Sequence, residues 1–367
     1  MSTKKPEIKQ QHQHWVTAWL ASGAFWIALL VLVGGLTRLN EAGLSITEWE
    51  VISGIVPPVT EEQWDEAFAK YREIPEYQEL RGGMSLEEFQ TIYWWEWSHR
   101  MLARGLGILF IVPFGFYWWK GWLSRPLIRQ LKVIVALGLL QGLAGWYLVR
   151  SGLADQPYVT PWRLSLHLGL GFIIFGLLWR LVLQRTLIKE PARSDASGIS
   201  PIIRWTAFLL PVLILIQVMA GGLVSGMQAA YVYPTFPTMG GYWIPPELGL
   251  YGSVWSDILN NAITAQWIHR MMGWLLLALA IIVAAALFMR KPADGRLKVW
   301  TGVYAGVLIL QIALGAFLLL AGNPDGWASV HQMVALAVFA VTIGLAMLMN
   351  NRLPANAGED KSITNAI

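Results

Sequence analysis

The segment Glu96-Trp97-Ser98-His99-Arg100-Met101 returns 170 positions later as Gln266-Trp267-Ile268-His269-Arg270-Met271. At the same offset, Gln141 corresponds to Gln311 and Gly145 corresponds to Gly315. These residues are the ends of the stretches Gln141–Gly145 and Gln311–Gly315. Two separate stretches that agree on one offset indicate an internal duplication. The chain is therefore predicted to consist of two similar halves in the same orientation.

The duplicated segments lie in stretches that are long and apolar enough to cross a membrane. Of the 367 residues, 55% are hydrophobic and 14% are charged, which is far from a soluble globular domain. Lipid offers no partner for backbone N–H and C=O groups, so a span is a helix of about 20 apolar residues. Eight stretches meet this requirement, approximately Trp15–Leu36, Thr91–Trp119, Val133–Val149, Leu164–Leu183, Trp205–Val224, Ala262–Met289, Trp300–Ala321 and Ala328–Met349.

These stretches predict an all-α integral membrane protein with eight transmembrane helices. The duplication predicts two tandem four-helix bundles with pseudo-two-fold symmetry about the membrane normal. We expect an N-terminal segment at residues 1–14, a first half at 15–188, a linker at 189–200, a second half at 201–350 and a tail at 351–367.

Each half has a long loop after its first span. In the loop at residues 38–90, Ser85-Leu86-Glu87-Glu88 has the Ser-x-x-Glu form of a capping box, which predicts that a helix starts there. An acidic amphipathic stretch precedes it, from Glu61 to Tyr77. The loop at residues 225–261 is rich in Gly, Pro and Tyr and is expected to lack long regular structure.

The basic residues predict the orientation of the spans. By the positive-inside rule, both termini and the loops that carry these residues are cytoplasmic. The net charge of +4 then reflects topology, and no nucleic-acid surface is expected. No cleavable signal precedes the first span, so a bacterial inner membrane is the expected location. The basic residues on which this orientation rests are Lys4, Lys5, Lys9, Lys120, Arg125, Arg129, Lys132, Arg185, Lys189, Arg193, Arg204, Arg290, Lys291, Arg296 and Lys298.

Four of the six histidines fall near the outer ends of the even-numbered spans, namely His99, His167, His269 and His331. Two facing histidines at one depth in a four-helix bundle can bind an iron porphyrin between them, and each half supplies one such pair. A single buried histidine is about equally well explained as a hydrogen-bonded interior residue. Four at matched depth favour heme. Zinc is disfavoured, because no Cys, Asp or second His lies at ligand spacing beside any of them.

The repeat differs at one chemically important position, where the first half has Glu96 and the second has Gln266. A carboxylate one helical turn before His99 lies on the same helix face and can reach a group bound beside the iron. The alternative is a structural ion pair between Glu96 and Arg100 at i+4. Arg100 and Arg270, at the outer side, are candidate contacts for heme propionates.

These residues resemble the heme A synthase family, specifically its cysteine-free mitochondrial and proteobacterial class, over essentially the whole chain. The similarity rests on segments in both halves: Gly34–Leu39, Gly43–Ile46 with Glu48-Trp49, Tyr93–Arg100, Gln141–Gly145, His167, Gly221-Gly222, Gln266–Met271 and His331. The chain has no cysteine, so the extracellular cysteine pair of Gram-positive members is absent.

The resemblance implies that the C8 methyl group of heme O is hydroxylated twice to a hydrate that loses water, giving the formyl group of heme A. It also implies that His269 and His331 ligate a prosthetic heme b, that His99 and His167 hold the substrate heme, and that Glu96 assists the reaction. The expected partners are heme O, the farnesyltransferase that makes it and an electron donor.

Two other classes of protein remain open at this stage. One is a bis-histidine cytochrome b that acts only in electron transfer; the Glu96/Gln266 difference argues against it, because a pure relay needs no such asymmetry. The other is a transporter, which the repeat alone suggests and which leaves the matched histidines unexplained. The sequence does not identify the electron donor, and it leaves open whether the chain forms a homo-oligomer.

Overall fold

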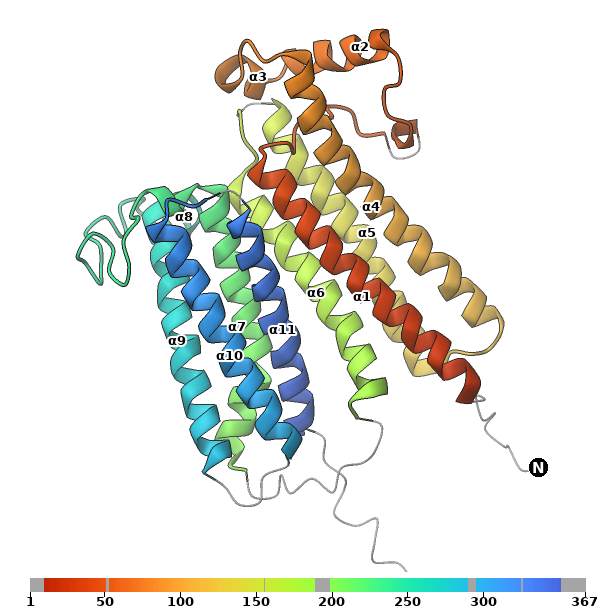
Figure 1. Cartoon of the computed structure of the whole chain (residues 1–367), viewed down its shortest axis with the longest axis vertical. Coiled ribbons are helices and arrows are strands. Elements are labelled where there is room, and N and C mark those ends of the chain that lie inside the picture. Colours follow the sequence, from red (N-terminus) through yellow and green to blue (C-terminus); the bar gives the residue numbers. More distant parts are fainter. Residues whose placement is uncertain are drawn as a thin grey trace, which may run out of the picture.

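The structure is a computed structural model that describes residues 10–50, 53–154, 156–188, 199–289, 295–324 and 326–350. Most of the predicted linker, the tail and the first nine residues lie outside this part of the chain. All eight predicted spans are confirmed as helices long and apolar enough to cross a membrane. They are α1 (Gln10–Leu39), α4 (Leu86–Trp119), α5 (Arg125–Ala154), α6 (Pro161–Thr186), α7 (Pro201–Gly226), α9 (Ala262–Phe288), α10 (Gly295–Leu320) and α11 (Trp327–Asn350) (Figure 1).

Local sequence signals explain where several of these helices begin. The predicted capping box is confirmed at the start of α4: the Ser85 side chain accepts from the Glu88 backbone N–H, and the Glu88 carboxylate accepts from the Ser85 backbone N–H at 2.8 Å. Proline opens α6 and α7, where its missing N–H costs nothing. Most of these helices extend beyond the apolar stretches predicted from the sequence, because hydropathy identifies only the apolar part of a helix.

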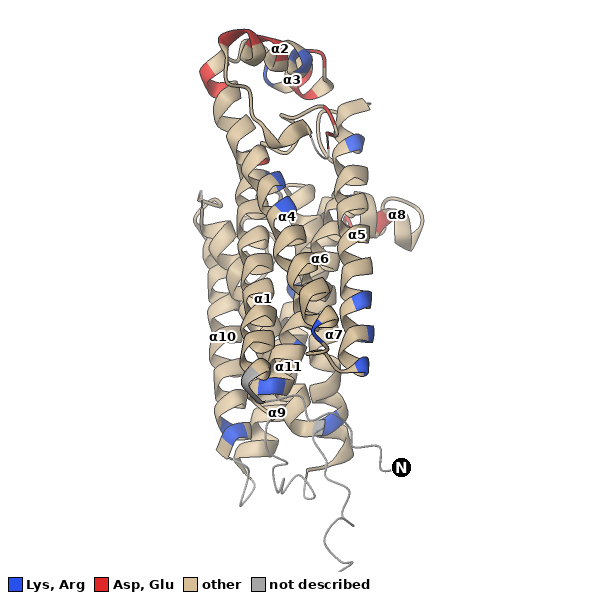
Figure 2. Ribbon diagram, turned by 90° about the vertical axis from the view of Figure 1, so that its right-hand side faces the viewer, with Lys and Arg blue, Asp and Glu red and all other residues tan. Residues whose placement is uncertain are grey.

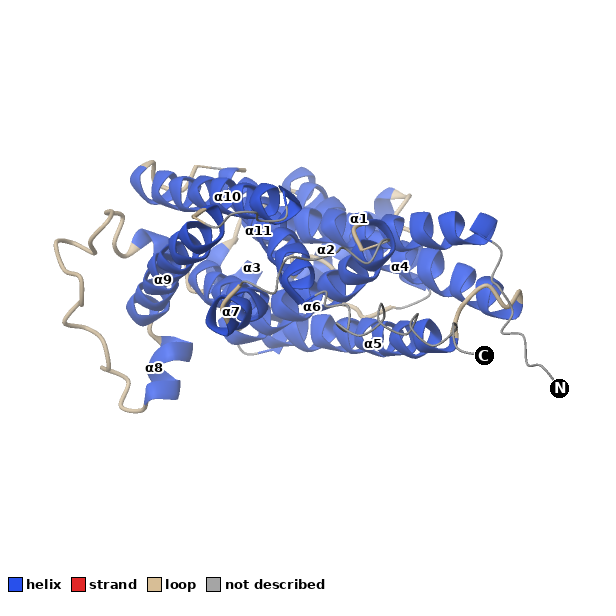
Figure 3. Ribbon diagram, turned by 90° about the horizontal axis from the view of Figure 1, so that it is seen from below, coloured by secondary structure: helices blue, strands red, loops and turns tan. Residues whose placement is uncertain are grey.

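The two expected halves correspond to α1, α4, α5 and α6, and to α7, α9, α10 and α11. They meet in the middle of the molecule, where α6 packs on α7 and α11 packs on α1 (Figure 3). Side chain to backbone hydrogen bonds cross this interface. They include those from Ser165 Oγ to the Met219 carbonyl at 2.7 Å, from Gln332 Nε2 to the Val31 carbonyl at 3.2 Å and from Trp179 Nε1 to the Ala340 carbonyl at 3.1 Å. One apolar core runs through both halves.

A small subdomain covers the N-terminal end of α4, which is the end that the basic residues predict to be the outer one. It contains η1 (Ser53–Ile55), α2 (Glu61–Arg72) and α3 (Pro75–Leu80) and has its own apolar core, in which Phe68, Tyr71 and Phe89 are fully or almost fully buried. Stacked rings at 4.9 Å join Phe68 of α2 to Phe89 of α4. The subdomain is therefore tied to the helix that carries Glu96 and His99.

The outer loop of the second half follows the expectation of little regular structure. Between α7 and α9 it forms only the short helices η3 (Ala229–Tyr231) and α8 (Val254–Asn260), joined by turns. Figure 1 shows it extending to the side of the bundle.

Charge is distributed unevenly along the bundle. Acidic residues gather on α2 and α3, and several of the basic residues lie near the opposite end (Figure 2). At that end the His12 imidazole stacks on Trp122 with ring centroids 4.0 Å apart, so His12 is less solvated than its place in an N-terminal segment suggests.

Candidate functional site

Each of the four histidines packs against a glycine of a neighbouring helix. The histidines lie on α4, α6, α9 and α11, and the glycines lie on α1, α5, α7 and α10. A Cβ atom built on the glycine would meet the imidazole Cε1 at 2.9 Å for Gly34 and His99, 3.0 Å for Gly145 and His167, and 3.1 Å for Gly221 and His269 and for Gly315 and His331. The duplicated sequence thus produces the same helix–helix contact four times, and a larger residue at any of these glycines would displace the ring.

In the second half the two histidines face each other across the bundle. The ring centroids of His269 and His331 are 6.5 Å apart, with the ring planes at 64°. An iron ion bound to both rings at about 2 Å, with each ring centre about 1.1 Å behind its nitrogen, places the centres roughly 6 Å apart. This pair has the spacing of two axial ligands on one iron.

The contacts of His269 also select the tautomer that a metal ligand needs. Its Nδ1 lies 3.2 Å from the Gln217 carbonyl oxygen, and only a protonated Nδ1 can donate to that acceptor. The lone pair is then on Nε2, the nitrogen available to iron.

Glutamine amides accompany three of the four histidines. The Nε2 atoms of Gln141, Gln217 and Gln311 lie 3.3, 3.5 and 3.0 Å from the imidazole Nε2 of their respective histidines. The partners are His167, His269 and His331. Sequence reasoning used Gln141 and Gln311 only to align the halves and missed Gln217.

In the first half, His99 lies on α4 and His167 on α6, and among the described residues their rings form no close contact like that of His269 and His331. Neither ring nitrogen of His99 forms a hydrogen bond with the described residues, in contrast to the other three histidines. The first pair is therefore the less constrained of the two.

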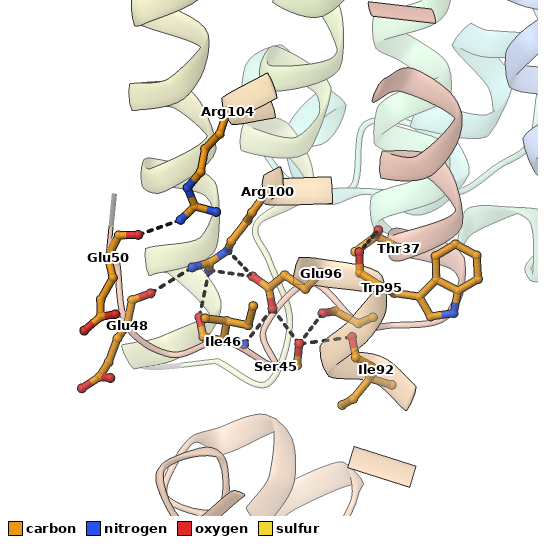
Figure 4. A network of polar contacts seen from close by, with 11 residues as sticks. Thr37, Ser45, Ile46, Glu48, Glu50, Ile92, Trp95, Glu96, Arg100 and Arg104 are labelled. Atoms are coloured by element: carbon orange, nitrogen blue, oxygen red, sulfur yellow. Dashed lines mark hydrogen bonds and ion pairs between the residues drawn. The ribbon is translucent and has the colours of Figure 1, made fainter. Parts of the chain in front are cut away.

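Glu96, about one helical turn before His99 on α4, lies at the centre of a buried polar network. Figure 4 shows the side chains of this network. Its Oε1 accepts from Arg100 Nη2 at 2.7 Å and Nε at 3.1 Å, and its Oε2 accepts from Ser45 Oγ and from the Ile46 backbone N–H, both at 2.8 Å. The structural ion pair considered above is thus present. Ser45 lies 51 residues away in the sequence, and nothing in the sequence predicts this contact.

Arg100 continues the network into the outer loop. It donates from Nη2 to the Ile46 carbonyl at 2.8 Å and from Nη1 to the Glu48 carbonyl at 2.9 Å, while Arg104 donates to the Glu50 carbonyl at 2.7 Å. Together Glu96 and the two arginines hold the loop segment 45–50 against α4.

The matching residues of the second half hold the other outer loop. Gln266 Nε2 donates to the Tyr233 carbonyl at 3.2 Å, and Arg270 donates to the carbonyls of Tyr233 at 2.7 Å, Thr235 at 2.6 Å and Thr238 at 3.1 Å. Within the part of the chain that the structure describes, Arg270 forms no ion pair, whereas the charge of Arg100 is neutralised by Glu96. The contacts of Arg100 and Arg270 with heme propionates stay a prediction. Arg270 suits this role better than Arg100, because no carboxylate among the described residues neutralises its charge.

The residues present fit a heme better than a bare metal ion. Among the described residues, no three His, Asp or Glu side chains converge as a bare ion would need. A porphyrin supplies four equatorial nitrogens itself, so two axial imidazoles complete the coordination. Fold and site together define a multi-pass membrane protein with paired histidines suited to heme iron.

Comparison with known proteins identifies the family. The family described as "Cytochrome oxidase assembly protein" matches residues 17–343. The heme A synthase of Bradyrhizobium diazoefficiens is 42% identical over 341 residues, which cover 91% of this chain and 90% of the relative. The heme A synthase of Rhodopseudomonas palustris is 44% identical over 89% of this chain and 89% of the relative. The heme A synthase of Nitrosospira multiformis is 38% identical over 93% of this chain and 95% of the relative. The chain belongs to the heme A synthase family, whose members are oxidoreductases with a heme-related substrate and cofactor.

Proposed function

We propose that this enzyme converts heme O to heme A by two successive hydroxylations of the C8 methyl group, followed by loss of water from the hydrate to leave the formyl group. The observation that carries the proposal is the fourfold histidine–glycine contact, in a chain of the heme A synthase family. A cytochrome b that acts only in electron transfer is not favoured by the comparisons.

The two halves are proposed to divide the work. His269 and His331 would ligate a prosthetic heme b, which supplies an electron-transfer centre when bound. Their 6.5 Å spacing and the fixed tautomer of His269 support a permanent site. His99 and His167 would hold the substrate heme, and the freer imidazole of His99 suits a ligand that must be exchanged in every turnover.

Glu96 is proposed to assist the reaction in the substrate half. A carboxylate at this position can act as a proton shuttle or as a positioning group, and the geometry favours positioning because both carboxylate oxygens already accept hydrogen bonds. In this role Glu96 fixes α4 against the loop segment 45–50 and so sets the outer boundary of the substrate site.

The location and partners follow from the same proposal. Basic residues near one end of the bundle support an inner-membrane protein with cytoplasmic termini and with α2 and α3 on the outer side. The enzyme that makes heme O and an electron donor are the proposed partners. Association with a second copy of the chain is a further option that the proposal leaves open.

The test is production of heme A in a bacterial host that lacks its own heme A synthase and contains a heme O synthase. Hemes extracted from membranes and separated by chromatography should include heme A when this chain is expressed and only heme B and heme O with an empty vector. Unchanged heme B and heme O in the presence of well-expressed protein would refute the proposed function.

A further inference from the structure

A second break in the repeat lies one helical turn before the glycine that contacts the first histidine of each half. Gly34 of α1 and Gly221 of α7 are equivalent, since each is the first glycine of a Gly-Gly-Leu segment and each contacts a histidine. Four residues earlier, on the same helix face, α1 has Leu30 and α7 has Gln217. The two halves therefore differ directly beside an iron-ligand candidate.

Gln217 holds His269 from two sides. Its side-chain Nε2 donates to the His269 backbone carbonyl at 2.9 Å and lies 3.5 Å from the imidazole Nε2, while its backbone carbonyl faces Nδ1 at 3.2 Å. Bound iron would take the place of the amide at the imidazole Nε2. The amide would still hold the His269 backbone carbonyl and the Gln217 carbonyl would still face Nδ1, and these two contacts limit movement of the imidazole. Gly221 confines the remaining side, because a Cβ atom built on it would meet the imidazole Cε1 at 3.1 Å.

Leu30 offers no such link to His99. A leucine side chain has no donor, and the Nδ1 atom of His99 is buried without a hydrogen-bond partner. Gly34 is the contact that confines the ring. An imidazole held by packing alone can turn away from iron more easily than one that is also held by hydrogen bonds.

The second histidine of each half does not share this difference. Gln141 and Gln311 are equivalent residues that accompany His167 and His331, at 3.3 and 3.0 Å. Each pair therefore has one matched, amide-held member, and the asymmetry between the halves falls on His99 and His269 alone.

We propose that the Leu30/Gln217 difference decides which half retains its heme and which half releases it. Gln217 is a positioning residue that keeps His269 oriented toward iron, so heme b stays bound. Leu30 leaves His99 free to turn, so the first half can take up heme O and release heme A. This inference rests on the proposed function, because it assumes that each histidine pair binds a heme.

Heme loss from purified full-length protein tests the role of Gln217. Protein from cells without heme O synthase would be mixed with excess apomyoglobin, and transfer of heme b followed by its Soret absorption. Gln217→Met removes the amide at similar volume, and loss should become roughly 10- to 100-fold faster, the usual effect of removing a group that orients a metal ligand. Ile216→Met, at the exposed neighbouring position, is the matched control and should lose heme at the wild-type rate.

Electron paramagnetic resonance separates this role from a general loss of stability. The ferric low-spin signal depends on imidazole orientation and should shift in Gln217→Met, while the signal of Ile216→Met stays as in wild type. The reciprocal change, Leu30→Gln, should slow release of heme O from loaded protein by a similar factor, whereas Leu30→Met adds no donor and should not.

The outcomes distinguish the inference from the function on which it rests. Equal heme-loss rates and equal spectra in Gln217→Met and Ile216→Met would overturn the inference and leave the proposed function intact. Wild-type protein that binds neither heme b nor heme O would overturn both.

Discussion

Replacing Glu96 with glutamine should loosen the outer loop of the first half and stop methyl oxidation. The change gives the first half the Gln-Arg combination that the second half has naturally at Gln266 and Arg270. It removes the charge from the two hydrogen bonds with Arg100, at 2.7 and 3.1 Å, although Arg100 retains its bonds to the Ile46 and Glu48 carbonyls. The folded protein therefore keeps its main architecture.

The size of the effect follows from these contacts. Hydrogen bonds to charged groups contribute about 1.5–3 kcal/mol and neutral ones about half as much, so the substitution should cost roughly 2 kcal/mol of local stability. At about 1.4 kcal/mol per factor of ten, segment 45–50 should open roughly 30-fold more often. With the amide oxygen toward Arg100, the amide nitrogen faces Ser45 Oγ, which can accept a hydrogen bond from it, whereas the Ile46 backbone N–H loses its acceptor and adds to this cost.

Amide hydrogen exchange of segment 45–50 measures this opening, and heme chromatography on the same preparation measures the reaction. Glu87→Gln, an exposed change at the start of α4, is the matched control and should alter neither. Wild-type exchange in segment 45–50 of the Glu96→Gln protein would refute the positioning role. Normal heme A production by that protein would refute any contribution of Glu96 to the reaction.

Three further predictions concern other parts of the fold. Burial raises the pKa of Glu76 to about 7, above the usual 4.5. The stabilising contribution of this carboxyl group is therefore complete below pH 4.5 and is lost as the pH rises through 7. Proteolysis of the outer subdomain should increase from about pH 5 to about pH 8 in the wild type, but not in Glu76→Gln. Gly221→Ala should displace His269 by a few tenths of an ångström and shift the heme spectrum, whereas Gly306→Ala, with open space around it, should not. Phe89→Ala should cost the outer subdomain about 3–5 kcal/mol, measured by denaturant unfolding followed by tryptophan fluorescence.

Those parts of the architecture that depend on local sequence were predictable. Eight spans follow from length and hydropathy, and the start of α4 follows from Ser85 and Glu88, because a capping box involves residues three positions apart. The histidines were recognisable because the repeat places each pair at one depth. Such features need no knowledge of which helices are neighbours.

Contacts between distant segments were not predictable in the same way. The bonds from Glu96 to Ser45 and Ile46 depend on the path of a long loop, which has no periodic pattern. For the same reason the carbonyl partners of Arg270 could not be anticipated from the sequence. The shared Gly-Gly-Leu segments were visible in the sequence, but their contact with His99 and His269 required knowing that α1 packs on α4 and that α7 packs on α9.

The most direct test of the account compares the hemes retained by two single-histidine variants expressed together with a heme O synthase. His269→Ala should lose heme b, and His99→Ala should keep heme b but contain neither heme O nor heme A. If both variants lose the same heme to the same extent, the two halves do not hold different hemes and the proposed division of work is wrong.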